Sequence, residues 1–319
     1  MKFNKKSVFA ILLAVIIVGV FTFVRISTRT TLKVDEENYI PIEERGYDNS
    51  SVLISAQELK EVKDQDDVAV IDFRRNDQYV LGHIPGAIQV WRSDVTDPDH
   101  EYAGMRISHE GLANWLGENG ISNNDTVVIY TSGGGHDAAR MWWMMTMIGH
   151  KDVRLLDGGL DYWRAIGYNT TMSSPSRDAV EYRLGDVNES MLASLDDVLA
   201  AIEDQETVVL CTRSQDENTG TNQLGGANRA GRIPSTYFIE WTEVLNEENL
   251  FKTADELRDL YEANGIISDK GVINYCQSGV RSAHTTFVLS QLLGYEDVKN
   301  YDGSWIEWSH REDLPIEKD

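Results

Sequence analysis

A cysteine stands where a strand-like run gives way to helical spacing. The run GVINY, residues 271–275, is followed directly by Cys276, and three small or polar residues then lead to Val280 and Arg281. Beyond Arg281 apolar residues recur at helical spacing. A thiol at the carboxyl end of a strand, just before a helix, lies where α/β folds place reactive groups. These residue types therefore predict a nucleophilic thiolate at Cys276.

The residues after Cys276 are suited to stabilising a negative charge. Gly279 permits a tight loop whose backbone N–H groups turn inward, and the following helix adds its positive end. Such an environment lowers the pKa of a thiol. Arg281 adds a permanent positive charge for an incoming anionic substrate. The alternative, that Cys276 is an ordinary buried cysteine, stays open on residue chemistry alone.

The elements that must position this loop occur twice in the chain. The run VVIYTSGGGHDAAR is matched by VINYCQSGVRSAH, so that Thr131 stands 145 positions before Cys276. The run GHIPG from Gly82 is matched by GRIPS from Gly231, 149 positions further on. Strand-like and helical runs alternate in both copies. We therefore expect an α/β protein with two copies of one domain, each a parallel sheet flanked by helices.

The first residues differ in composition from the repeats. Three lysines precede an uncharged run from Val8 to Val24, which predicts a membrane segment at residues 1–28. No small-residue cleavage pattern follows, so we expect an uncleaved anchor, with the rest of the chain periplasmic or at the cell surface; cleavage would make the protein secreted. The remaining predicted parts are a polar tether at 29–50 that holds the domains off the bilayer, a first domain without a catalytic cysteine at 51–172, a linker at 173–190 and a catalytic domain at 191–319.

Composition argues against several classes of function. The net charge is −23 and the pI is about 4.6, which does not suit nucleic-acid binding. The seven histidines form no H-E-x-x-H or Cys/His spacing, so we expect no metal and no cofactor. The two cysteines, Cys211 and Cys276, are too few for a disulfide scaffold. A regulatory disulfide between them is a hypothesis, with a simply buried Cys211 as the alternative.

The duplicated pattern resembles the tandem-domain rhodanese family of sulfurtransferases from about Ser51 to Pro315. The similar runs are VIDFR, LGHIPGAIQV and VRLLDGGLDYW in the first copy, and RAGRIPST, GVINYCQSGVRSA and DVKNYDGSW in the second. The resemblance implies a catalytic second domain and a first domain that has lost its nucleophile, in agreement with Thr131. It implies transfer of a sulfane sulfur from a small anionic donor through a Cys276 persulfide. The implied acceptor is a thiol or cyanide, with a thioredoxin-like protein as one candidate.

The same resemblance assigns the residues that bind the donor. Backbone N–H groups of the loop are expected to hold the thiolate and the persulfide. Arg213 keeps the arginine of the family's Asp-x-Arg, although Cys211 replaces the aspartate. The expected substrate-binding residues are Arg213, Gln277, Ser278, Gly279, Val280 and Arg281.

The loop sequence leaves the donor open between two candidates. Relatives that use thiosulfate carry basic residues after the cysteine, and relatives that use 3-mercaptopyruvate carry Gly-Ser-Gly-Val-Thr. Gln277 and Ser278 fit neither pattern fully. Arg281 retains a charge for a dianion, so thiosulfate is favoured and 3-mercaptopyruvate is the alternative.

Two other functions compete with sulfur transfer. Cysteine phosphatases of related fold have five residues between the cysteine and the arginine, whereas four lie between Cys276 and Arg281. The loop is therefore a residue short for a phosphate. A membrane-tethered binding or sensor module without turnover is the second rival, because Cys211 and Arg232 replace the aspartate and histidine of the repeat pattern. Persulfide formation on Cys276 separates this rival from the enzyme.

Overall fold

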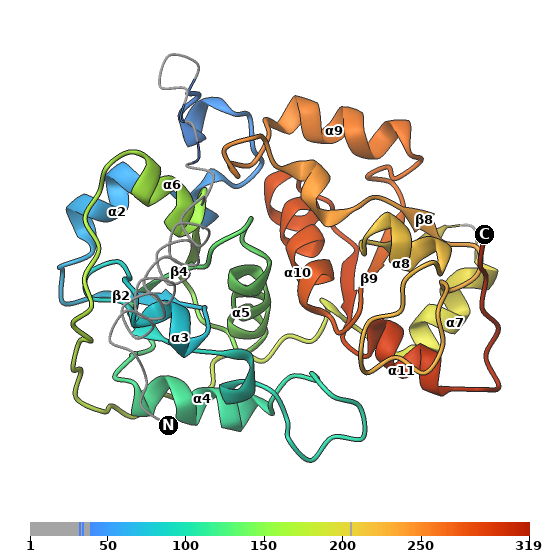
Figure 1. Ribbon diagram of the computed structural model, residues 1–319, viewed down its shortest axis with the longest axis horizontal. Coiled ribbons are helices and arrows are strands. Elements are labelled where there is room, and N and C mark those ends of the chain that lie inside the picture. The colour runs from blue at the N-terminus through green and yellow to red at the C-terminus, as the bar shows by residue number, and fades with distance from the viewer. Residues whose placement is uncertain (1–31, 33, 35–38, 205) are drawn as a thin grey trace, which may run out of the picture.

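The computed structural model describes residues 32, 34, 39–204 and 206–319, which form two domains side by side (Figure 1). Each domain has a five-stranded sheet, with strand order β1-β5-β4-β2-β3 in the first and β6-β10-β9-β7-β8 in the second. Every named strand pair is parallel. The predicted duplication of an α/β unit is confirmed by this identical strand order.

The elements of the first domain follow one another as expected for βα units. They are β1 (Leu53–Ile54), α2 (Ala56–Val62), β2 (Val68–Asp72), α3 (Asn76–Tyr79), β3 (Ile88–Gln89), α4 (His109–Glu118), β4 (Thr126–Tyr130), α5 (His136–Met147), β5 (Val153–Leu156) and α6 (Gly159–Ala165). Three 3₁₀ turns join them, η1 (Ile42–Glu44), η2 (Ser50–Val52) and η3 (Arg92–Asp94).

The second domain repeats this order. Its elements are β6 (Leu192–Ala193), α7 (Leu195–Glu203), β7 (Thr207–Cys211), α8 (Gln215–Thr219), β8 (Tyr237–Phe238), η4 (Trp241–Val244), α9 (Ala254–Ala263), β9 (Gly271–Tyr275), α10 (Val280–Phe287), the π-turn η5 (Val288–Leu292), β10 (Val298–Tyr301) and α11 (Ser304–His310). Residues 173–189, within the predicted linker, have no helix or strand and run back along the first domain, where Arg177 binds Asp125.

The central strands are apolar because helices cover both faces of each sheet. All five residues of β2 are buried, as are the last four of β4, β7 and β9. Capping boxes start the helices around them, as at Ser55 of α2, Ser194 of α7 and Thr253 of α9. The carboxyl ends of the central strands are thereby held at one edge, where the loops follow.

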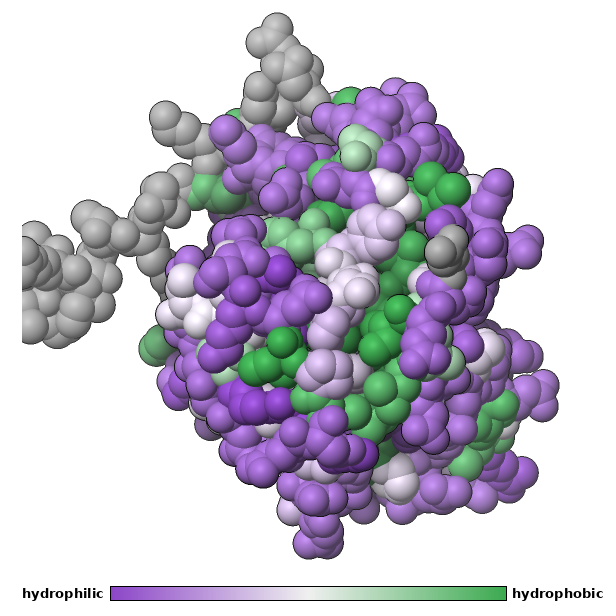
Figure 2. Space-filling model, turned by 90° about the vertical axis from the view of Figure 1, so that its right-hand side faces the viewer, coloured by the Kyte–Doolittle hydropathy of each residue, from purple (hydrophilic) through white to green (hydrophobic). Residues whose placement is uncertain are grey.

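The predicted membrane segment at 1–28 lies outside the described residues. Among the residues that the structure does describe, no helix has the length and apolar character needed to cross a bilayer. The surface seen from the side of the second domain is mostly hydrophilic, with a strip of hydrophobic residues across it (Figure 2).

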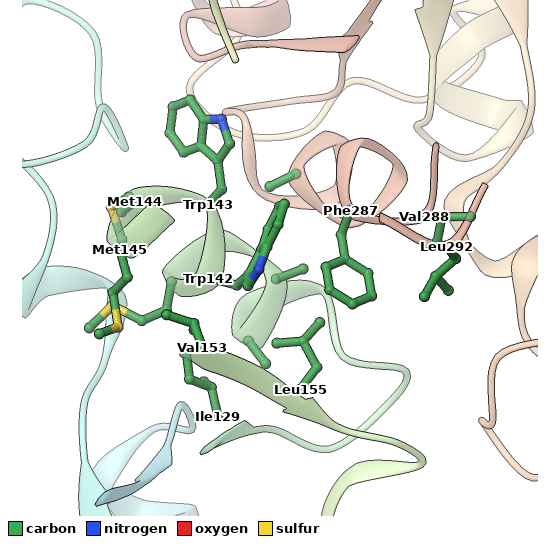
Figure 3. Packing of buried hydrophobic residues seen from close by; sticks show 14 of the residues in the cluster. Ile129, Trp142, Trp143, Met144, Met145, Val153, Leu155, Phe287, Val288 and Leu292 are labelled. Carbon is green, nitrogen blue, oxygen red and sulfur yellow. The ribbon is translucent and has the colours of Figure 1, made fainter. Parts of the chain in front are cut away.

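Helices α5 and α10 pack against each other between the two sheets and join the domains (Figures 1 and 3). Trp142 of α5 meets Phe287 of α10 edge to face, with ring centroids 4.9 Å apart. Both rings belong to one hydrophobic cluster that draws residues from both domains. Burial of aromatic side chains of this size dominates the packing energy of such a contact. The loop at residues 276–279, just before α10, is therefore held against the first domain.

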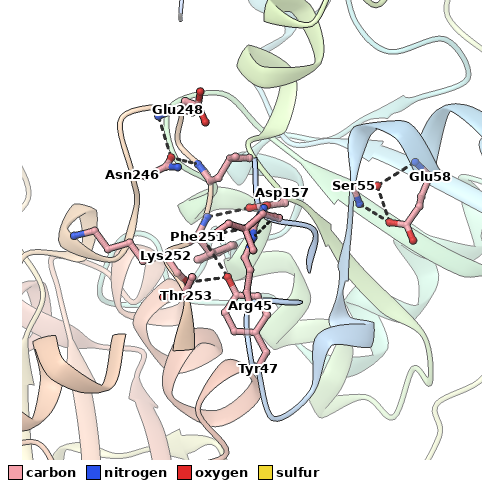
Figure 4. A network of polar contacts seen from close by, with 12 residues as sticks. Arg45, Tyr47, Ser55, Glu58, Asp157, Asn246, Glu248, Phe251, Lys252 and Thr253 are labelled. Carbon is pink, nitrogen blue, oxygen red and sulfur yellow. Dashed lines mark hydrogen bonds and ion pairs between the residues drawn. The ribbon is translucent and has the colours of Figure 1, made fainter. Parts of the chain in front are cut away.

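Residues 39–50, predicted as part of a free tether, instead form a strap between the two domains (Figure 4). Arg45 is 4% exposed, and its Nη1 lies 2.7 Å from Asp157 Oδ2 in the first domain and 3.0 Å from the carbonyl of Phe251 in the second. The Tyr47 hydroxyl also donates to the Phe251 carbonyl, at 3.2 Å. The tether prediction did not include these contacts, because charge alone does not show that a cation has a buried partner.

Candidate active site

Cys276 directly follows β9, which lies between β10 and β7 in the second sheet. The loop after it turns at Gly279, whose φ of 72° is in the left-handed region, and α10 begins at Val280. A Cβ at Gly279 would lie 2.7 Å from Arg140 Nη1 and 2.8 Å from Asp302 Oδ1. Only glycine fits there without a shift of its neighbours.

Ser304 fixes the base of the loop. Its Oγ accepts the backbone N–H groups of Cys276, at 3.2 Å, and of Gly279, at 3.0 Å, and donates to the Tyr301 carbonyl at 2.6 Å. These two N–H groups are thus bound to a hydroxyl rather than turned toward the sulfur. The sequence analysis did not predict a role for Ser304. The available signal was that the first copy, which lacks the cysteine, has Gly159 at the matching position.

The Cys276 thiol is 1% exposed and lies among groups that favour its anion. Burial raises the pKa of a thiol, but the charge of Arg281, the hydroxyl and N–H of Ser282 and the N–H of Ser278 outweigh it. The pKa of Cys276 therefore lies below its ordinary value. The Ser282 hydroxyl donates to Sγ across 3.4 Å. These donors favour the thiolate form of Cys276, which is the form that the predicted nucleophile requires.

Arg281 makes a bidentate ion pair with Glu217 of α8. Its Nη1 lies 2.6 Å from Oε2 and its Nη2 lies 2.8 Å from Oε1. Glu217 is 3% exposed and is also held by the capping box of α8, where Oε2 accepts the Ser214 hydroxyl at 3.0 Å. Burial raises the pKa of Glu217, but Arg281, with smaller contributions from Arg213 and Ser214, more than offsets it, so the pKa of Glu217 lies below its ordinary value. Sequence reasoning missed Glu217, for which the S-x-x-E capping pattern was the available signal.

Arg213 does not lie in the open part of the loop. It is 1% exposed and packs with its guanidinium 4.6 Å from the Trp305 ring centroid and 5.4 Å from that of Tyr275. Its Nη2 donates to the Gly231 carbonyl at 2.8 Å, and its Nε donates to Cys211 Sγ at 3.3 Å. Because the guanidinium is buried on these partners, its position gives no support to a contact with the donor.

Both cysteines are free in the structure. Cys211 is paired with Tyr275 across the sheet and packs into the core with Tyr275 and Trp305. The hypothesis of a disulfide to Cys276 finds no support in this arrangement, and the alternative of a buried Cys211 describes it. Among the described residues, no group of three His, Cys, Asp or Glu is placed to hold a metal ion.

The remaining predicted loop residues differ in their exposure. Gln277 points outward, and its side-chain amide donates to the Gly225 carbonyl at 3.2 Å. Ser278 lies against Gly104 of the first domain, where an added Cβ would be 3.1 Å from the serine Cβ. Val280 is buried at the first position of α10. The structure thus brings Gln277, Ser278, Gly279, Val280 and Arg281 together around Cys276.

The first domain supports the loop from outside. Arg140 of α5 is 3% exposed, pairs with Asp302 and donates to the Gly279 carbonyl at 3.3 Å. His136, at the start of α5, packs its ring 4.5 Å from that of Trp241 in the second domain. The glycines before His136 form a turn, with positive φ angles at residues 133–135.

Comparison with known proteins follows the same division into two domains. The rhodanese-like domain family matches residues 55–166 and again residues 194–311. This chain belongs to the rhodanese family. A putative thiosulfate sulfurtransferase of Saccharopolyspora erythraea is 39% identical over 246 residues, which are 75% of this chain and 86% of the relative. The sulfur carrier protein TtuD of Thermus thermophilus is 38% identical over 284 residues, 86% of this chain and 99% of the relative.

Solved structures give the same fold. The anaerobic ergothioneine biosynthesis enzyme of Chlorobium limicola, in complex with trimethyl histidine, has a TM-score of 0.77 at 25% identity. The match covers 85% of this chain and 71% of that enzyme. A structure of EanB with a cysteine persulfide matches with the same TM-score and identity. The predicted enzyme class, a sulfurtransferase of the rhodanese family, is confirmed by the family and by the curated relatives.

Proposed function

We propose that this rhodanese moves a sulfane sulfur from a small anionic donor, with thiosulfate favoured, through a persulfide on Cys276 to a thiol or cyanide. The observation that carries the proposal is the Cys276 thiol, whose pKa is lowered by Arg281 and by the Ser282 and Ser278 donors despite complete burial. A thiolate is the form of cysteine that attacks sulfur.

The reaction balances in two displacement steps. The Cys276 thiolate attacks the outer sulfur of thiosulfate, a sulfur–sulfur bond forms on the enzyme, and sulfite leaves with the electron pair of the broken bond. The acceptor thiolate or cyanide then attacks the outer sulfur of the persulfide, and Cys276 leaves as the thiolate. The same donors around Sγ serve as the resting site of the anion at the start and the end of the cycle.

The donor is proposed on two grounds. Several relatives are named thiosulfate sulfurtransferases, and Arg281 places a guanidinium beside the loop. The alternative donor is 3-mercaptopyruvate, which is a monoanion. The loop pattern of the relatives that use it has a serine and a glycine at the positions of Ser278 and Gly279. The neighbour EanB was captured with a cysteine persulfide, which supports the same intermediate here.

The acceptor and the location are proposed from the sequence. A relative that is called a sulfur carrier protein supports a protein thiol as acceptor, and a thioredoxin-like protein has the required reactive thiol. The run from Val8 to Val24 supports an anchor that places both domains outside the cytoplasm. Membrane fractionation of cells, with proteolysis of the exposed domains from either side, tests this location.

Intact mass of the full chain tests the proposed chemistry. Incubation with thiosulfate, and separately with 3-mercaptopyruvate, is expected to add about 32 Da, the mass of one sulfur, to the wild type. Cyanide should remove the added mass, and Cys276→Ser should not gain it. No gain with either donor on folded, reduced protein would instead favour a binding module without turnover.

A further inference from the structure

The ion pair between Glu217 and Arg281, beside Cys276, has a fixed geometry. Glu217 Oε1 and Oε2 bind both terminal nitrogens of Arg281, at 2.8 and 2.6 Å, and Oε2 accepts the hydroxyl of Ser214 as well. Both partners are largely removed from water, with side-chain exposures of 4% for Glu217 and 17% for Arg281. A bidentate guanidinium–carboxylate pair in such surroundings fixes the geometry of both groups.

The internal duplication shows that the fold does not require this pair. The capping serine of α8, Ser214, is matched by Arg75 at the start of α3, so Glu217 corresponds to Gln78, which is exposed. Arg281 corresponds to His136. The first domain keeps the same sheet without the pair, and it also lacks the cysteine. Cysteine, glutamate and arginine are thus present together in one copy and absent together from the other.

The pair also determines the charge that a donor meets. The charge of Arg281 is cancelled by Glu217, so the thiolate, the guanidinium and the carboxylate together carry one negative charge. Of the other cations near the loop, Arg140 is paired with Asp302, and Arg213 keeps its charge but is buried away from the open part of the loop. His136, on the first-domain side, has its pKa lowered, first by burial and also by Arg281, and so favours the neutral form. A dianion is therefore attracted less than Arg281 alone would suggest.

We propose that Glu217 is a positioning residue that fixes Arg281 beside Cys276 and, by cancelling its charge, limits how far the site favours a dianionic donor over a monoanionic one. This inference rests on the proposed function and names the determinant of its donor class. It assigns to the sulfur-transfer site a residue of α8 that lies outside the catalytic loop.

The decisive variant is Glu217→Gln, which keeps an oxygen to accept from Ser214 and Arg281 but removes the negative charge. The ratio of kcat/KM for thiosulfate, a dianion, to that for 3-mercaptopyruvate, a monoanion, is expected to rise about tenfold, since one extra donor charge then meets an uncancelled guanidinium. The rise should shrink with added salt. Asp216→Asn, an exposed change of the same charge on the same helix, is the matched control and should leave the ratio unchanged.

A second measurement does not depend on turnover. The pH profile of Cys276 alkylation by iodoacetamide is expected to move to lower pH in Glu217→Gln, because the thiolate loses a nearby negative charge. An unchanged donor ratio together with an unchanged alkylation profile, in a folded variant, would overturn the proposal. If wild-type protein took sulfur from neither donor, the proposed function would fail, and the alkylation profile would still decide the role of Glu217.

Discussion

The two domains differ in the residues that follow their central strands, although the strands themselves end in the same way. In the first, Tyr130 ends β4, and its hydroxyl accepts the N–H of Ile84 at 3.0 Å; in the second, Tyr275 ends β9 and accepts the N–H of Ile233 at 3.3 Å. Thr131 follows the first tyrosine and Cys276 the second. The same strand end is thus held by the same bond in both copies. The frame and the chemistry can be changed independently.

A second difference lies beneath the strand ends. In the first domain Arg74 binds Asp72, with Nε 2.8 Å from Oδ1, and the Tyr130 hydroxyl donates to Asp72 at 2.7 Å. In the second, Cys211 stands in place of the aspartate, and Arg213 has no carboxylate there. The catalytic copy therefore retains the buried cation without its usual counterion. The second domain thus lacks the ion pair that Asp72 and Arg74 form in the first.

The largest effect on persulfide formation is expected from exchanging Cys276, which follows β9, and Thr131, which follows β4. Cys276→Ser should abolish persulfide formation, because no other described thiol lies in the loop. Thr131→Cys in that background should not restore it, since Gln78 and His136 provide neither the carboxylate nor the guanidinium. Intact mass after incubation with thiosulfate measures both. A cyanide-removable sulfur on the Thr131→Cys protein would show that the frame alone suffices.

Replacing both Glu217 and Arg281 by neutral residues should cause a smaller loss, in the rate of persulfide formation. Glu217→Gln with Arg281→Gln leaves no lone buried charge and removes the cation that lowers the pKa of Cys276. The pKa should rise, and the rate of persulfide formation at pH 7 should fall about tenfold, in proportion to the thiolate fraction. Stopped-flow measurements from pH 6 to pH 10 test this. Equal rates in the double variant and the wild type would show that Arg281 does not activate the thiol.

The buried arginines allow a reciprocal test of stability. Asp72→Cys should lower the free energy of unfolding by about 3 kcal/mol, because Arg74 is left as an uncompensated buried charge. Cys211→Asp should raise it by about 1 kcal/mol, by supplying Arg213 with a carboxylate. Urea denaturation at pH 7 measures both. Similar values for the two variants would mean that the two arginines have equivalent surroundings.

The last expected effect is a dependence of stability on pH at the contact between the domains. His284 of α10 is fully buried, and burial, followed by the neighbouring His136, lowers its pKa to about 3. A histidine with a depressed folded-state pKa binds more protons when unfolded, so stability is complete above the unfolded pKa of about 6.5 and is lost as pH falls toward the folded pKa. Between pH 7 and pH 5 the loss should be about 2 kcal/mol.

Urea denaturation at the two pH values tests this dependence. His284→Leu, which has no titrating group, should show a smaller loss than the wild type. The matching position in the first copy is Ala139, but burial also lowers the pKa of His136 and of His150 in that copy, so the His284 variant should keep part of the pH dependence. A variant with the same pH dependence as the wild type would place the titrating group elsewhere.

The sequence predicted what depends on local pattern. The duplication, the strand before Cys276 and the turn at Gly279 all follow from residue spacing, and the structure has them. Glu217 and Ser304 were not predicted, because each acts through a partner that is far away in the chain. Nothing in the local sequence says which carboxylate a given arginine will meet.

Arg213 shows a further limit of prediction from local sequence. Its place in an Asp-x-Arg pattern implied contact with the donor, but burial between Tyr275 and Trp305 is a property of the packed sheet. The pattern identifies the residue and not its environment.

The strap at residues 39–50 has a mechanical consequence. Arg45 and Tyr47 bind the chain at the junction of the two domains, so a pull on the chain from its upstream side is delivered to both domains at once. A fragment that begins at Ser51 lacks this strap and exposes Asp157 without its counterion. A fragment of this sulfurtransferase that keeps these contacts must therefore include residues 39–50 as well as the two domains.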